Sequence, residues 1–174
     1  MTCRHIHYEA AFEDYLRSRG TPYVPVDETR KVIFSGSKVK SFDFLVYPGA
    51  GRHWIVDVKG RRFPYPTRNG VGRYWENWVG QQDLEGLAEW ERVFGDDFEA
   101  RFVFAYLLGG PPDRWPATAP YVFREDRYVF LTVTLADYQA HCRPRSTSWR
   151  TVAVACKTFR EITHPVDSFG SNGL

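Results

Sequence analysis

Two aspartates and a lysine lie in short apolar segments of the chain, where charged side chains are unusual. Asp43 interrupts the apolar segment 41–47, and Asp57 and Lys59 end the apolar segment that begins at His53. Burying an unpaired carboxylate or ammonium in such a strand is costly in free energy. A divalent cation held by both carboxylates would offset that cost, because Mg²⁺ prefers hard oxygen ligands. The spacing therefore predicts a metal centre.

The same residues have the chemistry of a centre that activates water. Lys59 follows Asp57 by two residues, so in a strand the two side chains point to the same face. If Asp43 lies on a neighbouring strand, both carboxylates and the backbone carbonyl of Val58 could bind the ion. The Lys59 ammonium could then orient the attacking water or help deprotonate it, and balance the charge of the transition state.

The elements that must position these residues follow from the hydrophobic pattern. The apolar spacing predicts a helix over residues 7–19 that ends at Gly20, and a second helix over 81–94. Residues 60–80 lack a clear period and are predicted to form a long loop. Further predictions are extended segments at 23–26, 31–34, 41–47, 53–59, 101–108, 121–124, 128–134 and 149–156, and a helix over 135–142 capped by Thr134.

This order of elements resembles the PD-(D/E)xK nuclease superfamily, and within it the Holliday-junction resolvase-like members. Their first helix carries the pattern E-x-x-x-x-x-Y-L-x-x-x-G and their core strand reads V-E-V-K-x-R. Here the first pattern corresponds to Glu9, Tyr15-Leu16 and Gly20, and residues 56–61 read V-D-V-K-G-R. The resemblance covers residues 9 to about 104. This sequence departs from it in having no proline before Asp43, an aspartate at position 57 and a long loop before the second helix.

The resemblance implies a restriction endonuclease-like α/β fold, with three α/β/α layers around a central mixed β-sheet. It implies an endonuclease that uses Mg²⁺ or Mn²⁺ to hydrolyse DNA, including branched or structured DNA. The implied catalytic residues are Glu9, Asp43, Asp57 and Lys59, and the implied metal ligands are Asp43, Asp57, the Val58 carbonyl and Glu9. Glu13, one helical turn from Glu9, is the alternative for the accessory role. Dimers are common among such resolvases, which makes a homodimer a further expectation.

Arginines interleaved with aromatic residues precede the second predicted helix. Such a mixture can contact phosphates and stack on bases, and the helix opens with two glutamines where the superfamily often places a polar residue near the scissile phosphate. The predicted nucleic-acid contacts are Arg61, Arg62, Arg68, Arg73, Gln81 and Gln82. In an alternative interpretation the aromatic residues of this segment, Trp75 and Trp78 in particular, simply pack on the core.

Composition limits the remaining possibilities. The 174 residues fit one domain over 1–174, with a core at about 5–108, an elaboration at about 109–164 and a loose tail at 165–174. The longest apolar run is too short to cross a bilayer, and the three cysteines show no disulfide spacing, so we expect a cytoplasmic protein without a membrane partner. The net charge is only +2, so any affinity for DNA must come from local clusters of lysine and arginine.

Two alternatives remain open. The chain could be a nuclease-fold binding or scaffold module without turnover, contacting nucleic acid or a protein partner. Cys3, His5 and His7 alternate along the chain and could share one face of a strand as zinc ligands, although no fourth ligand is evident. The sequence shows no nucleophile elbow and no glycine-rich phosphate loop, which disfavours hydrolase triads and nucleotide-binding folds.

Overall fold

The structure is a computed structural model that describes residues 6–27, 33–34, 37–72, 74–116 and 119–169. Its helices are α1 Ile6–Ser18, α2 Gln81–Phe94, α3 Leu135–His141 and α4 Cys156–Ile162, with short 3-10 turns at Pro112–Arg114 and Val166–Phe169. Its strands are β1 Tyr23–Pro25, β2 Ile33–Phe34, β3 Ser37–Lys38, β4 Phe44–Val46, β5 His53–Phe63, β6 Tyr65–Thr67, β7 Gly70–Gly72, β8 Val79–Gly80, β9 Phe98–Leu108, β10 Tyr121–Phe123, β11 Asp126–Thr134, β12 Arg143–Ser146, β13 Thr151–Ala153 and β14 His164–Pro165.

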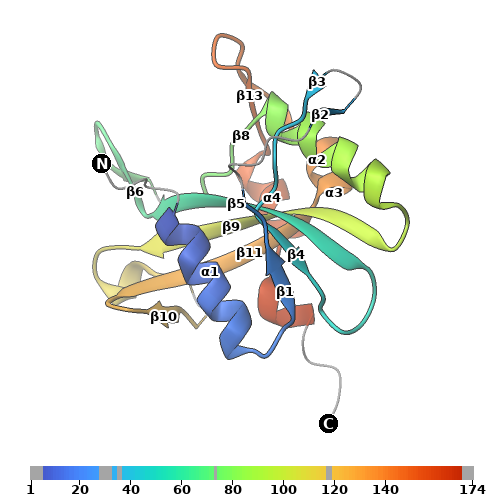
Figure 1. Cartoon of the computed structure of the whole chain (residues 1–174). Helices are drawn as coiled ribbons and strands as arrows, with labels where there is room; N and C mark the ends of the chain where they lie inside the picture. Colours follow the sequence, from blue (N-terminus) through green and yellow to red (C-terminus); the bar gives the residue numbers. More distant parts are fainter. Residues whose placement is uncertain (1–5, 28–32, 35–36, 73, 117–118, 170–174) are drawn as a thin grey trace.

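A mixed sheet of seven strands forms the centre of the molecule (Figure 1). Its strand order is β1-β4-β5-β9-β11-β10, and β14 also pairs with β11. β5 and β9 run parallel over their full length, while the other described pairs of this sheet are antiparallel. β9 is buried over most of its length, which confirms the prediction that its apolar run is a strand covered on both faces.

Helices cover both faces of this sheet, so the molecule has three layers (Figure 1). On one face, Phe12 and Leu16 of α1 lie in a cluster with Val56 and Val58 of β5. On the other face, residues of α2, α3 and α4 pack in a second cluster that includes Ile55. Alternation along β5 therefore points Ile55, Asp57 and Lys59 toward the α2 side. The predicted restriction endonuclease-like α/β/α fold with a central mixed sheet is confirmed.

Local signals placed three of the four helices. α1 lies within one residue of the predicted bounds at each end, and Gly20 follows it with φ +63°. α2 spans the predicted residues. Thr134 caps α3 as expected, because its Oγ1 accepts a hydrogen bond of 3.0 Å from the Asp137 N–H.

The prediction of a loop over residues 60–80 was wrong in large part. Parallel pairing with β9 carries β5 on to Phe63, and β6, β7 and β8 lie in the same interval. The glycine at position 60 suggested that the strand ended there. In the structure Gly60 is part of β5, and the Tyr8 ring packs where a side chain at position 60 would lie. β4 is shorter than the predicted strand 41–47. Residues 31–32 of the predicted strand 31–34 lie outside the described residues.

The C-terminal part also differs from the expectation. β13 occupies only the middle of the predicted strand 149–156, and α4 follows it. β14 pairs with β11, and Val166 in the following 3-10 turn is buried. The looseness of the tail 165–174 stays a prediction. Residues 170–174 of the predicted tail lie outside the described residues. None of the helices in the described part of the chain is both long and apolar enough to span a bilayer.

Candidate metal centre

Asp43 lies at the point where β4 leaves β5. Its N–H donates to the Val56 carbonyl at 2.8 Å, and its Oδ2 accepts a hydrogen bond of 2.6 Å from the Val58 N–H. β4 pairs with β5 only as far as Val56. Beyond Val56, the Val58 N–H of β5 is bonded by the Asp43 carboxylate instead of by a strand backbone. The N–H and C=O of one strand residue point to the same side, so the Val58 carbonyl faces the same edge as the Asp43 carboxylate.

Asp57 and Lys59 share the α2 face of β5, as their spacing predicts. The Lys59 Nζ lies 2.8 Å from Asp57 Oδ1 and 3.0 Å from Oδ2. The side chains are only 13% and 8% exposed for Lys59 and Asp57, so both charges are largely removed from water. The Asp43 carboxylate therefore bonds to β5 at Val58, the residue between Asp57 and Lys59.

A third carboxylate, absent from the sequence prediction, completes this charged group. Asp83 is the third residue of α2, and its Oδ2 lies 3.2 Å from the Lys59 Nζ. The same oxygen accepts a hydrogen bond of 2.8 Å from the Gly80 N–H, and Lys40 pairs with the other oxygen. The available signal was an aspartate at the third position of a predicted helix, where a side chain often bonds back to the residue before the helix.

Burial and neighbouring charges act differently on the three groups. Burial raises the pKa of Asp57, and the nearby Asp83 charge adds to this although Lys59 opposes it. Burial acts to lower the pKa of Lys59, but Asp57 and Asp83 outweigh it and the pKa is raised. Burial also opposes ionisation of Asp83, yet Lys59 and Lys40 hold its pKa below the usual value. A further cation would therefore stabilise the ionised form of Asp57 more than that of Asp83, which Lys59 and Lys40 already favour.

The predicted accessory glutamates lie on α1, across the sheet from Asp57 and Lys59. Glu9 is in the first turn of α1 and is half-buried. Its neighbour Tyr8 packs against Gly60, where a Cβ would lie 2.1 Å from the Tyr8 ring, so this turn lies against β5 beside Lys59. Glu13 accepts a hydrogen bond of 2.9 Å from the Tyr23 hydroxyl, which assigns it a structural contact. The role of Glu9 stays a prediction.

The donor set of the centre fits a hard divalent cation. Asp43, Asp57 and the Val58 carbonyl offer oxygen atoms along one strand edge, and Mg²⁺ commonly completes such a set with water and phosphate. Within the described ranges, no group of three or more histidine, cysteine, aspartate or glutamate side chains is arranged to hold a metal ion. The peptide carbonyl and exogenous ligands are therefore needed to complete the coordination.

Arg61 is not the exposed phosphate contact that we predicted. It is 8% exposed, its guanidinium donates to the Gly60 and Trp78 carbonyls, and it stacks on the Trp78 ring at 4.2 Å. Alternation along β5 points it inward, toward the α2 side. The alternative interpretation holds for Trp75, whose ring packs on Tyr106 at 4.4 Å.

The other predicted nucleic-acid contacts keep accessible side chains where they are described. Arg62, Arg68 and Gln82 are exposed and Gln81 is half-buried, whereas Arg73 lies outside the described residues. Of the alternative zinc ligands, Cys3 and His5 also lie outside them, and His7 contacts the Tyr128 hydroxyl.

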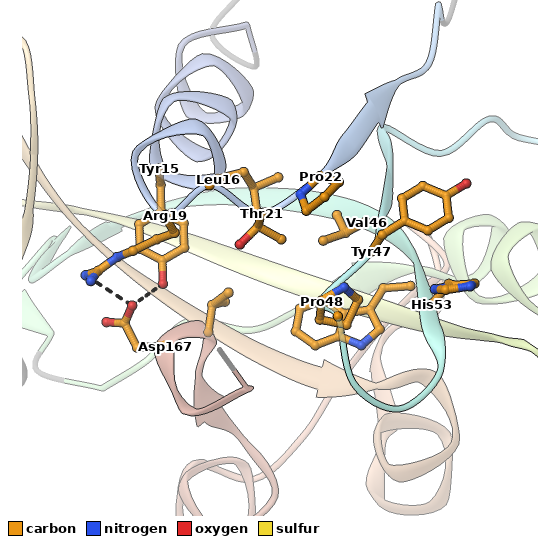
Figure 2. Close-up of a pocket in the computed structure, with 14 residues that line it drawn as sticks. Tyr15, Leu16, Arg19, Thr21, Pro22, Val46, Tyr47, Pro48, His53 and Asp167 are labelled. Carbon is orange, nitrogen blue, oxygen red and sulfur yellow. Dashed lines mark hydrogen bonds and ion pairs between the residues drawn. The ribbon is translucent and has the colours of Figure 1, made fainter. Parts of the chain in front are cut away.

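A pocket of about 650 Å³ lies at the C-terminal end of α1 (Figure 2). Tyr15 of α1 and Arg19, which follows the helix, both contact Asp167 on one side of it, and Tyr47 and His53 lie on the other. None of Asp43, Asp57 and Lys59 lines this pocket. The charged centre is therefore a feature of the strand edge and not of this cavity.

The strand order and the helices on both faces of the sheet define a three-layer α/β/α fold of the restriction endonuclease-like type. Among solved structures, the chain is similar to Hjc, a Holliday junction resolvase from Archaeoglobus fulgidus, with a TM-score of 0.56 and 11% sequence identity. The similarity covers 99% of this chain and 99% of the resolvase chain, so it extends past the first half that carries the sequence resemblance. No family model and no curated protein matches the sequence. At this identity the likeness shows the fold alone.

Proposed function

We propose that the protein is a metal-dependent endonuclease that hydrolyses phosphodiester bonds in DNA, with branched or structured DNA as its preferred class. The observation that carries the proposal is that Asp43 accepts a hydrogen bond from the Val58 N–H, between the paired residues Asp57 and Lys59 of β5. The three-layer fold shared with a solved Holliday junction resolvase supports it. Fold alone does not determine activity, so the argument depends on the site.

In this proposal Asp43, Asp57 and the Val58 carbonyl hold a Mg²⁺ or Mn²⁺ ion. The bound ion would supply a polarised water and neutralise charge on the scissile phosphate. Both Asp57 oxygens contact Lys59, and each would keep a further lone pair with which to hold the ion. Glu9 is the proposed accessory ligand, and from the turn of α1 that packs beside Lys59 it would bind a metal-bound water or a second ion.

Lys59 is the proposed residue that positions the attacking water and balances the charge developing on the phosphate. Asp83 lies 3.2 Å from its ammonium and is held by the Gly80 N–H, so it would help to keep Lys59 in place with Asp57 bound to an ion. Asp57 and Asp83 raise the pKa of Lys59 and so favour its charged form, which suits electrostatic support and positioning.

The DNA would lie along the surface near the start of α2. Arg62 and Arg68 offer exposed guanidinium groups, and Gln81 and Gln82 open the helix that carries Asp83. Arginine contacts to phosphate fix the position of a duplex without reading its sequence. A homodimer would allow two strands of a branched substrate to be cut in concert, and it remains part of the proposal.

Cleavage of labelled DNA by the wild type and by Lys59→Ala tests the function. With Mg²⁺ or Mn²⁺, we expect the wild type to cut a four-way junction and Lys59→Ala to lose about 10²-fold or more in rate, as for removal of a preorganised electrostatic group. Lys157→Ala, which removes an exposed lysine of α4, is the matched control and should cut at the wild-type rate. Equal rates for Lys59→Ala and the wild type would refute the assignment.

A second candidate is a binding module of the same fold without turnover. The contacts that favour it are those of the Lys59 ammonium, which is already neutralised by Asp57 and Asp83 in the structure. This candidate predicts that the wild type binds junction DNA. It also predicts no cleavage of single-stranded, duplex or junction DNA with either Mg²⁺ or Mn²⁺. The proposed nuclease predicts cleavage of at least one of them.

A further inference from the structure

An exposed hairpin lies beside the start of α2 and is not used by the proposed centre. β12 and β13 form it, with residues 147–150 as its turn. β13 also pairs with β8, which leads directly into α2, and the Gln81 N–H donates to the Arg150 carbonyl at 2.8 Å. Figure 1 shows the turn that precedes β13 extending away from the central sheet.

The hairpin is tied to the charged centre through two routes. Gly80 pairs with Thr151 of β13, and its N–H is also the donor to Asp83. The Trp78 ring lies between two guanidinium groups, at 4.2 Å from that of Arg61 on β5 and 5.4 Å from that of Arg145 on β12. A ligand held by the hairpin would therefore pass close to Lys59 and Asp83.

The tip of the hairpin presents a tryptophan to solvent. Trp149 is 81% exposed, more than any other large hydrophobic residue in the described part of the chain. The turn that carries it is built locally, because the Trp149 N–H donates to the Ser146 hydroxyl at 3.2 Å and the Arg150 N–H donates to the Thr147 carbonyl at 3.2 Å. Holding an indole in water is unfavourable, so a stacking partner would account for its position.

The charges around Trp149 are positive. Arg143, Arg145 and Arg150 are all exposed, and no acidic residue occurs between Arg143 and Arg160. The nearest paired acid is Glu85 of α2, whose carboxylate lies 4.0 Å from the Arg150 guanidinium and is itself well exposed. An exposed aromatic ring among arginines matches a nucleic-acid strand with unpaired bases, in which the ring stacks on a base and the arginines contact flanking phosphates.

We propose that the β12–β13 hairpin binds DNA with unpaired bases next to the scissile phosphate, with Trp149 stacking on one unpaired base. This inference rests on the proposed function and names its substrate class more closely. A fully paired duplex has no free base face for the indole, so Trp149 adds little to its binding. Junctions, bulges and single-stranded flanks expose such a face.

The test compares the affinity of Trp149→Ala for two DNA duplexes that differ only in a three-nucleotide bulge. Binding is measured by fluorescence anisotropy with the Lys59→Ala protein as background, so that no cleavage occurs. Loss of one base–aromatic stack lowers affinity by roughly 5- to 150-fold. We therefore expect Trp149→Ala to weaken binding of the bulged duplex about tenfold and binding of the paired duplex less than twofold.

Trp149→Phe keeps an aromatic face and should retain most of the affinity for the bulged duplex. Val122→Ala, which removes another exposed hydrophobic residue, is the matched control and should leave the ratio of the two affinities unchanged. Equal loss on both duplexes, or no loss on the bulged duplex, would overturn the inference. If that inference fails but the wild type cuts DNA, the proposed nuclease function still stands. If the protein binds the bulged duplex selectively but cuts no DNA, only the proposed binding by the hairpin stands.

Discussion

At the scale of single residues, two of the three buried aspartates of the centre, Asp57 and Asp83, have pKa values shifted in opposite directions. Asp57 has a raised pKa because burial dominates, so its ionised form is disfavoured in the folded protein. Asp83 has a lowered pKa because Lys59 and Lys40 outweigh its burial, so its ionised form is favoured. Asp57 is therefore unfavourable for stability, which is typical of a residue retained for function. Asp83 instead stabilises its neighbours Lys59 and Lys40.

We expect Asp57→Asn and Asp83→Asn to change the free energy of unfolding of the metal-free protein in different directions. Asp57→Asn removes a disfavoured charge and leaves Lys59 paired with Asp83, so at pH 7 it should match the wild type within about 1 kcal/mol or exceed it. Asp83→Asn removes a favoured charge that serves two lysines and a helix cap, and should cost about 1–3 kcal/mol. Urea unfolding at pH 7 measures both.

The pH dependence of that difference follows from the direction of the Asp83 shift. A carboxyl whose pKa is lowered on folding contributes stability above its unfolded pKa, and loses it as the pH falls through its folded pKa. The deficit of Asp83→Asn should therefore be full above about pH 4 and shrink in stronger acid. A deficit for Asp57→Asn larger than that for Asp83→Asn at pH 7 would contradict this account of the centre.

The sequence was informative about residues whose charge conflicted with an apolar segment. Asp43, Asp57 and Lys59 stood out for that reason, and in the structure the Asp43 carboxylate bonds to β5 at the residue between the other two. Asp83 lies in a helix rich in acidic residues, where one aspartate does not differ visibly from its solvated neighbours. Arg61 was misassigned because its burial depends on the continuation of β5, which the predicted loop had ended.

At the scale of elements, β5 and its glycine organise the centre. β5 carries Asp57, Val58 and Lys59 and continues through Gly60, where α1 approaches so closely that a Cβ would lie 2.1 Å from the Tyr8 ring. This approach holds the first turn of α1, with Glu9, against the strand. Helix ends were readable from local caps, but the length of β5 was set by pairing with the distant β9, which no local pattern reveals.

Gly60→Ala should destabilise the protein by about 1–3 kcal/mol, because the methyl group must displace the Tyr8 ring in a packed interface. Gly109→Ala is the control, since a Cβ at Gly109 meets nothing within 4 Å, and its effect should stay within about 0.5 kcal/mol. Thermal or urea unfolding measures both variants. Equal stabilities for the two would show that α1 does not depend on this contact.

At the scale of the whole molecule, the fold separates the parts that the proposed activity needs. The central sheet supplies a rigid edge for the charged residues, and α2 brings Asp83 to Lys59 from the face opposite α1. The hairpin at the start of α2, Arg62 of β5 and Arg68 offer exposed positive charge. The chain order of elements predicted this architecture, while the hairpin and α4 depended on tertiary contacts of the C-terminal part.

The most direct test of the central claim is a crystal structure of the protein soaked in Mn²⁺, with the ion located by its anomalous scattering. We predict an anomalous peak at the edge of β5, within coordination distance of the Asp43 and Asp57 carboxylates and the Val58 carbonyl, at about 2.0–2.3 Å from each oxygen. Asp43→Asn crystals treated in the same way should show a weaker peak. No peak at this edge at saturating Mn²⁺, with Lys59 still bound to both Asp57 oxygens, would contradict the account.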